Sequence, residues 1–307
     1  MALRVLFMGT PHYAVVIADG LSKLSDMSLR VVTQPDARVG RGYRLRASPV
    51  AVWAEEHGIE VDRPHRLNAM REAWEGFSPD LVITAAYGKI LPPWMLALPR
   101  LGALNVHASL LPRWRGPNPI AWAIRAGDVI TGVTLMSMDQ GIDTGPVYGQ
   151  RAVSVDAAVD MGGLTDVLAL AGRDLLVELL PDILAGRLGP TPQESTGMTT
   201  APKFSAEETK IPWQVEAFSI ARLIRSMSPS PAAYTMFRGR RLQILSAEAD
   251  PKVRMRPAAI AMDRNGALVG TGTEALRLCL VRPEGKRAMT GIEWARGIRL
   301  GEQEYFA

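Results

Sequence analysis

The stretch Leu3-Arg-Val-Leu-Phe-Met-Gly9 decides the fold of the N-terminal part of this 307-residue chain. It is an apolar run with the length of a buried strand, and it ends in Gly9-Thr-Pro11. An apolar pattern with helical spacing follows over residues 14–21, and residues 29–33 form a second strand pattern. Strand, helix and strand in succession predict a right-handed crossover and therefore a parallel sheet.

The same alternation continues along the next 150 residues. Asp80-Leu-Val-Ile-Thr-Ala-Ala-Tyr87 reads as a central strand, and further strands are predicted around residues 102–107, 129–138 and 147–153. Helices are predicted over residues 48–57, 119–127 and 161–184. The sequence therefore predicts an α/β, Rossmann-like, mostly parallel sheet. Neither a three-glycine dinucleotide fingerprint nor a phosphate-binding loop occurs, which argues against a nicotinamide enzyme.

The character of the chain changes after a stretch rich in Gly, Pro, Thr and Ser. A chain of this length suggests two domains. After one helix near residue 220, the last hundred residues show short alternating runs separated by Gly and Pro, which indicates a small β-barrel. We expect a first domain over residues 1–188, a linker over 189–206 and a second domain over 207–307.

Positive charge is concentrated in the last third of the sequence. Residues 207–307 hold 16 Lys and Arg against 11 Asp and Glu, whereas residues 1–206 hold 19 against 20. Such asymmetry suits a module that binds a polyanion beside a near-neutral catalytic domain. A generic solubilising surface would account for the same charge.

The composition favours one cellular compartment and argues against a metal cofactor. The single cysteine excludes an intrachain disulfide and favours a cytosolic setting. The four histidines and this cysteine show no spacing typical of metal ligands, so we expect no metal. The apolar run at the start is too short for a secretory signal or a membrane span, and we expect no association with membranes.

A possible acyl-transfer site lies in two short segments. Asn105 and His107 are two residues apart at the end of a predicted strand, so both side chains leave the same face. Asp143 lies in a short turn between Gly141 and Gly145. An amide donor, an imidazole and a carboxylate are the parts that such a site needs. Singly, each has an ordinary interpretation: a turn former, a buried histidine and a loop aspartate.

A basic stretch precedes the first of these segments. Residues 34–49 contain four arginines, two glycines and two prolines, with Asp36 as their single acid. This composition predicts a long mobile loop without regular structure. It could be an arginine arm that orders on RNA, or a solvated surface loop.

The two segments resemble a known signature. Asn105-Val-His-Ala-Ser-Leu-Leu-Pro112 and Gly141-Ile-Asp-Thr-Gly145 are similar to the motifs of the folate-dependent formyltransferases. The resemblance covers nearly the whole chain, and its flanks narrow it to members that formylate methionyl-initiator-tRNA. Those flanks are Phe7-Met-Gly-Thr-Pro11, Gln34-Pro-Asp36, Gly40-Arg-Gly42, Ala86-Tyr-Gly-Lys-Ile-Leu-Pro92, Arg222-Leu-Ile-Arg-Ser226 and Pro283-Glu-Gly-Lys-Arg287.

The resemblance implies a role for specific residues. The catalytic residues would be Asn105, His107 and Asp143. The residues that contact the folate would be Tyr87, Gly88, Ile90, Ser109, Leu110, Leu111 and Pro112. The residues that contact tRNA would be Arg38, Gly40, Arg41, Gly42 and Arg44, and the second, OB-like barrel domain would bind tRNA as well. Arg113 and Arg115 could meet either the folate tail or the RNA.

The expected reaction follows from this resemblance. The formyl group of 10-formyltetrahydrofolate would pass to the α-amino group of methionyl-initiator-tRNA by direct attack, through a tetrahedral intermediate. The alternatives are a formyltransferase that acts on a purine precursor or a sugar nucleotide, and an RNA-binding protein without catalytic activity. We expect a cytoplasmic monomer, because no long apolar helix or heptad repeat is left over.

Overall fold

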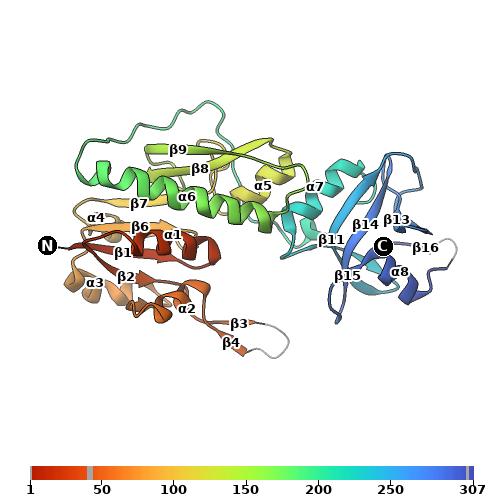
Figure 1. The fold of residues 1–307 in the computed structure, drawn as a ribbon, viewed down its shortest axis with the longest axis horizontal. Helices are drawn as coiled ribbons and strands as arrows, with labels where there is room; N and C mark the ends of the chain where they lie inside the picture. Colours follow the sequence, from red (N-terminus) through yellow and green to blue (C-terminus); the bar gives the residue numbers. More distant parts are fainter. Residues whose placement is uncertain (1, 40–43, 302–303) are drawn as a thin grey trace. The chain divides into compact units, whose positions relative to one another are not determined.

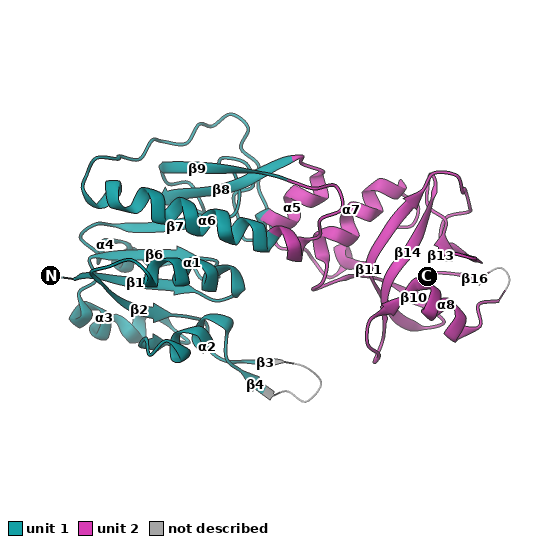
Figure 2. Ribbon diagram, in the orientation of Figure 1, with its two compact units in different colours: residues 1–119, 130–154, 165–202 teal, residues 120–129, 155–164, 203–307 magenta. Residues whose placement is uncertain are grey.

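The chain forms two compact units, each with its own sheet (Figures 1 and 2). The computed structural model describes residues 2–39, 44–301 and 304–307. The first unit comprises the segments Met1–Pro119, Ile130–Ser154 and Thr165–Pro202, and the second comprises Ile120–Val129, Val155–Leu164 and Lys203–Ala307. Each unit is thus assembled from segments that are separate in the sequence.

The first unit is built on a seven-stranded sheet. In spatial order its strands are β5 (Val61–Asp62), β2 (Met27–Val32), β1 (Leu3–Gly9), β6 (Leu81–Ala85), β7 (Ala103–His107), β8 (Ile130–Ser137) and β9 (Val147–Ser154). The first five run parallel to one another, whereas β8 pairs antiparallel with β7 and β9 pairs antiparallel with β8. The prediction of a mostly parallel α/β sheet is confirmed. The strand β6 is buried along its whole length, as its apolar sequence predicts.

Short helices lie between the strands β1 to β7 in the sequence. They are α1 (His12–Ser22), α2 (Pro49–Glu56), the 3₁₀ helix η1 (Leu67–Met70), α3 (Arg71–Phe77) and α4 (Pro93–Ala97), and the long helix α6 (Met161–Leu184) follows β9. The start of α2 follows from its sequence, because the hydroxyl of Ser48 accepts the N–H of Ala51 over 3.0 Å and Pro49 occupies the first helical position.

Gly9 has a packing role at the end of β1. A Cβ atom there would lie 2.4 Å from the Cβ of Ala14 and 3.0 Å from the carbonyl oxygen of Ala85. Only glycine therefore lets α1 approach the ends of the central strands this closely. This contact accounts for the glycine of the Gly9-Thr-Pro11 motif without any bound phosphate.

The basic stretch was predicted to lack regular structure, and this prediction is wrong for its two ends. Residues Ala37–Val39 form β3 and Arg44–Arg46 form β4, which pair antiparallel with Arg38 opposite Leu45. A two-stranded ladder satisfies backbone groups without burying side chains, so a charged composition does not prevent it. Both Arg38 and Leu45 are exposed. Gly40, Arg41 and Gly42 lie outside the described residues.

The second unit is an antiparallel sheet whose two edges meet. In spatial order its strands are β10 (Ala233–Phe237), β11 (Arg240–Asp250), β14 (Ala275–Pro283), β13 (Gly266–Val269), β12 (Ala259–Asp263) and β16 (Glu304–Tyr305), while β15 (Met289–Thr290) pairs with β14. Ala307, just beyond β16, exchanges two backbone hydrogen bonds of 3.0 and 3.2 Å with Met236 of β10. These bonds join the edge strands, and the predicted small β-barrel is confirmed.

An aromatic cluster fills the barrel. Trp213, Phe237, Trp294 and Phe306 are buried, and their ring centroids lie 5.2 to 5.9 Å apart. The helices of this unit are α5 (Pro119–Ala126), η2 (Glu207–Thr209), α7 (Ala217–Met227) and α8 (Gly291–Ile298). None of the helices in the described part of the chain combines the length and the apolarity that crossing a bilayer requires.

Asp80 provides a test of how the first sheet is held together. Its carboxylate accepts the backbone N–H of Arg4 and the guanidinium of Arg100, each over 2.8 Å, and these bonds lower the pKa of Asp80 to about 2. A carboxyl group whose pKa is depressed on folding stabilises the protein above its unfolded pKa, near 4, and that stabilisation is lost as the pH falls toward 2. We expect Asp80→Asn to lower the free energy of unfolding by about 1–3 kcal/mol at pH 7, measured by urea denaturation.

The pH dependence separates this effect from a change of shape. The difference between wild type and variant should shrink as the pH falls from about 4 to about 2. Asp166→Asn, at an exposed position on α6, serves as the control and should change little at either pH. An equal difference at pH 7 and at pH 2 would contradict the assignment.

Candidate active site

Three side chains that are distant in the sequence meet at the end of β7. Asn105 and His107 project from the same face of this strand, as their spacing predicts. Asp143 comes from the turn that follows β8. Its Oδ1 atom lies 3.6 Å from Nδ1 of His107 and 3.4 Å from the amide nitrogen of Asn105. The structure thus places together the amide, imidazole and carboxylate that the sequence marks as a site.

Asp143 is held by a backbone donor. Its Oδ2 atom accepts the N–H of Gly116 over 2.8 Å, and its own φ of 53° is left-handed, which is uncommon for a residue with a side chain. Gly116 has a φ of 124°, and a Cβ there would lie 2.9 Å from the carbonyl oxygen of Ala201. Glycine at 116 therefore lets this loop pack closely against the backbone of Ala201.

His107 is oriented from its other nitrogen. The side chain is buried, and Nε2 lies 3.0 Å from the carbonyl oxygen of Trp114. A carbonyl only accepts, so Nε2 carries a hydrogen in both the neutral and the charged imidazole. Nδ1 then faces Asp143 at 3.6 Å, which is beyond hydrogen-bond distance but close enough for an ion pair. Of the two ring nitrogens, Nε2 is thus the one held by the backbone and Nδ1 is the one that faces the carboxylate.

The amide of Asn105 is oriented by Thr84 on the neighbouring strand. The Thr84 hydroxyl donates to Oδ1 of Asn105 over 2.9 Å, and its weaker alternative acceptors are the carbonyl of Leu104 and the sulfur of Met138. Because Oδ1 faces this donor, the NH₂ group points toward Asp143. The amide is thus fixed as a hydrogen-bond donor to the site.

The segment predicted to contact folate through Ser109, Leu110, Leu111 and Pro112 follows β7 directly. Ser109 and Leu111 are buried, and Leu110 and Pro112 are partly buried. The segment is hydrogen-bonded to two neighbouring strands of the sheet, β8 and β9. Thr134 on β8 donates its hydroxyl to the carbonyl of Ser109 and accepts the N–H of Leu111, and Gln150 on β9 donates to the carbonyl of Leu111.

The other residues predicted to contact the folate are Tyr87, Gly88 and Ile90. Tyr87 lies in the core, whereas Gly88 and Ile90 lie at the surface. The ring of Tyr87 is buried in a hydrophobic cluster, and its carbonyl accepts the side chains of Thr10 and Gln34. Gly88 has a φ of 85°, and Ile90 is 76% exposed.

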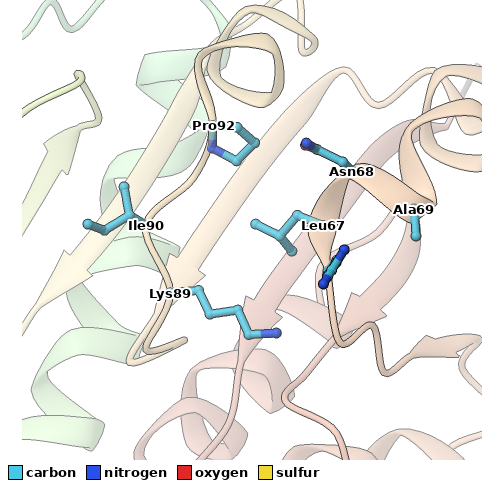
Figure 3. A pocket seen from close by; sticks show the side chains of 7 residues that line it. Leu67, Asn68, Ala69, Lys89, Ile90 and Pro92 are labelled. Carbon is cyan, nitrogen blue, oxygen red and sulfur yellow. The ribbon is translucent and has the colours of Figure 1, made fainter.

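Ile90 lies at the edge of a pocket of about 640 Å³ (Figure 3). Its lining residues come from η1 and from the loop before α4: Arg66, Leu67, Asn68, Ala69, Lys89, Ile90 and Pro92. The ammonium of Lys89 donates to the carbonyls of Pro64 and His65 over 2.9 and 3.0 Å, which fixes the two walls relative to each other. The lining of the pocket combines apolar side chains with the two cations Arg66 and Lys89.

The residues predicted to contact tRNA are only partly described. Arg38 on β3 is exposed, and the backbone of Arg44 on β4 pairs with Val39. Gly40, Arg41 and Gly42, which were also predicted to contact tRNA, lie outside the described residues.

Sequence reasoning missed a segment that holds the site. Residues 190–201, which we call the strap, fall inside the predicted linker but belong to the first unit. Two backbone hydrogen bonds join Thr191 to Val147 of β9, and the N–H of Arg115 donates to the carbonyl of Thr199 over 2.9 Å. Gln193 binds both Arg115 and the turn of Asp143. The composition of the strap is that of a solvated linker and offered no signal for these contacts.

Within the described residues, no group of three or more His, Cys, Asp or Glu side chains could hold a metal ion.

Two family models match the chain. The model described as formyl transferase matches residues 2–180, and the model described as formyl transferase, C-terminal domain, matches residues 203–299.

Curated relatives match over nearly their full length. The methionyl-tRNA formyltransferase of Halorhodospira halophila is 42% identical over 304 residues, covering 98% of each chain. That of Streptomyces coelicolor is 40% identical over 310 residues, covering 98% of this chain and 99% of the relative. That of Magnetococcus marinus is also 40% identical, over 306 residues, covering 98% of each.

Solved structures share the fold at lower identity. HypX from Aquifex aeolicus in complex with tetrahydrofolic acid has a TM-score of 0.71 and 19% identity, covering 99% of this chain and 49% of that one. The N-formyltransferase from Helicobacter canadensis, solved with folinic acid and dTDP-3-aminofucose, has a TM-score of 0.67 and 16% identity, covering 90% and 98%.

Thr84→Val tests the orientation of the Asn105 amide. Valine keeps the shape of threonine but removes the hydroxyl, so Oδ1 of Asn105 loses its donor, at a cost of about 1 kcal/mol. We expect the side-chain NH₂ signals of Asn105 to shift and broaden in ¹H–¹⁵N spectra while the protein stays folded. Thr131→Val, at a buried position on β8, is the matched control and should leave these signals in place. Unchanged Asn105 signals in Thr84→Val would show that the hydroxyl does not orient the amide.

Proposed function

The chain belongs to the formyl transferase family, and on this basis we propose that it transfers the formyl group of 10-formyltetrahydrofolate to the α-amino group of methionyl-initiator-tRNA. The observation that carries the proposal is the full-length similarity, at 39–42% identity, to relatives named methionyl-tRNA formyltransferase. The convergence of Asn105, His107 and Asp143 supplies a site suited to this chemistry.

Asn105 is the proposed donor to the oxyanion. The amine nitrogen attacks the formyl carbon, the carbonyl oxygen takes up negative charge in the tetrahedral intermediate, and the bond to N10 of the folate then breaks. An amide held by Thr84 can donate to this oxygen at any pH and without reorganising. Negative charge is thus stabilised where it develops.

His107 and Asp143 are the proposed path for the proton. The attacking amine must lose a proton, and the departing N10 must gain one. Nδ1 of His107 and Oδ1 of Asp143 lie 3.6 Å apart, so the two groups would act on the same reacting nitrogen. Because neither a Ser nor a Cys nucleophile is involved, the transfer is direct and no acyl-enzyme forms.

We propose that the donor lies against the segments that follow β7 and β6. Ser109, Leu110, Leu111 and Pro112 would contact the pterin, whose ring edges match backbone N–H and C=O groups. The carbonyl of Tyr87 and the turn at Gly88 would form the opposite wall. The pocket beside Ile90 is lined by apolar side chains and by the cations Arg66 and Lys89, which would suit the aromatic and carboxylate parts of the folate tail.

The tRNA would be bound by the hairpin β3–β4 and by the second unit. Arg38, Gly40, Arg41, Gly42 and Arg44 are the proposed contacts in the hairpin region. The excess of positive charge over residues 207–307 supports binding of RNA by the barrel domain. We further propose a first, catalytic domain over residues 1–188, and a cytoplasmic monomer.

The direct test is formyl transfer to charged initiator tRNA. Wild-type protein should formylate methionyl-initiator-tRNA and leave purine-precursor or sugar-nucleotide amines unmodified. Asn105→Ala should lower kcat by about 10²–10³-fold, because one oxyanion donor is removed. Asn105→Asp keeps the shape of the side chain but lacks the N–H donor, so its kcat should fall at least as far. His107→Ala and Asp143→Ala should also lose activity.

Two outcomes would contradict this proposal. Formylation of a small amine in preference to charged tRNA would assign the chain to the alternative function. A formyl-protein adduct trapped during turnover and seen by mass spectrometry would replace direct transfer with a covalent mechanism.

The contribution of the hairpin can be measured by a salt titration. If Arg38 contacts a phosphate, Arg38→Ala should weaken tRNA binding and reduce the slope of log Kd against log salt by about one unit. Lys23→Ala is the control, because Lys23 is an exposed cation already paired with Asp19. An unchanged slope in Arg38→Ala would remove Arg38 from the interface.

A further inference from the structure

The side chain of Gln193 joins the two loops on which the site is built. Its Nε2 group donates to the carbonyl oxygen of Asp143 over 2.9 Å and to that of Gly145 over 2.7 Å. Its Oε1 atom accepts Nε and Nη2 of Arg115 over 3.1 and 2.7 Å. The two N–H groups and the oxygen of this amide are therefore all engaged by the site loops.

The orientation of this amide follows from its partners. Carbonyl oxygens only accept and a guanidinium only donates, so the NH₂ group must face the turn and the oxygen must face Arg115. No other side chain of this length offers two donors and an acceptor. A glutamate would keep the bonds to Arg115 but would place an oxygen against the carbonyls of Asp143 and Gly145.

The turn needs such a clamp. Asp143 has a left-handed φ of 53°, a conformation that costs about 1–3 kcal/mol and persists only where surrounding contacts impose it. Its carboxylate reaches the N–H of Gly116 only if the turn is in register with the loop that holds Arg115 and Gly116. Gln193 bonds to both of these segments, so it sets the distance between them.

We propose that Gln193 is a positioning residue that holds the carboxylate of Asp143 against His107 and Asn105. It acts through the backbone of residues 143–145, and no step of the proposed reaction uses its side chain. Arg115 completes the clamp from the other side, which gives this arginine a structural role. The proposal rests on the function proposed above only because its activity assay measures formyl transfer.

Gln193→Glu tests the proposal with little change in shape. A displaced carboxylate should lower kcat by about 10–100-fold, because catalysis falls steeply with misplacement of a reacting group. The KM values for tRNA and folate should change less than about threefold. Gln193→Met, which also lacks the donors but adds no charge, should behave similarly.

A double-mutant cycle separates positioning from loss of fold. If Gln193 acts through Asp143, the loss caused by Gln193→Glu should shrink to less than about threefold in an Asp143→Asn background. An equal loss in both backgrounds, or a kcat of Gln193→Glu within about threefold of wild type, would overturn the proposal.

Hydrogen exchange provides a readout that needs no activity. The amide of Gly116 and the peptide that spans residues 139–147 should exchange faster in Gln193→Glu. Ser195→Glu adds the same charge at an exposed strap position and should leave both unchanged. Unchanged exchange in Gln193→Glu would overturn the positioning role. Failure of wild-type protein to formylate charged tRNA would instead overturn the proposed function and leave the exchange result to decide the role of Gln193.

Discussion

The hydrogen bond from the backbone of Gly116 to the carboxylate of Asp143 is the contact on which the site depends. At 2.8 Å it is shorter than the approaches of Asp143 to His107 and to Asn105, so it sets where the carboxylate lies. A backbone donor does not titrate and has no rotamers, which makes it a fixed reference point. The absence of a side chain at Gly116 lets the loop that carries this donor pack against the backbone of Ala201.

The site combines two residues on a rigid strand with a third on a turn that other segments hold in place. Asn105 and His107 stand on a strand whose neighbours on both sides are buried, so the sheet itself fixes their backbone. Asp143 stands on a turn at the end of β8, where the ladder no longer restrains the chain. The strap supplies the missing restraint through Gln193 and through its pairing with β9. A sheet provides two of the three groups, and a segment without secondary structure secures the third.

Much of the fold could be predicted from sequence, because buried strands such as β1 and β6 are continuous apolar runs with little ambiguity. The face shared by Asn105 and His107 followed from their spacing. The proximity of Asp143 did not, since only the resemblance of its motif joined it to them. The hairpin β3–β4 was missed because its pairing relies on backbone groups rather than on burial. Gln193 was missed because composition does not reveal where a polar side chain finds its partners.

The interleaving of the two units has a consequence for how this protein can be taken apart. The chain alternates between them five times, and residues 120–129 and 155–164 belong to the second unit although they lie within the sequence of the first. A cut at any single peptide bond therefore leaves at least one fragment with pieces of both units. The modules cannot be exchanged with a relative as two consecutive cassettes. A chimera would need to carry both of these inserted segments from the same parent as the barrel.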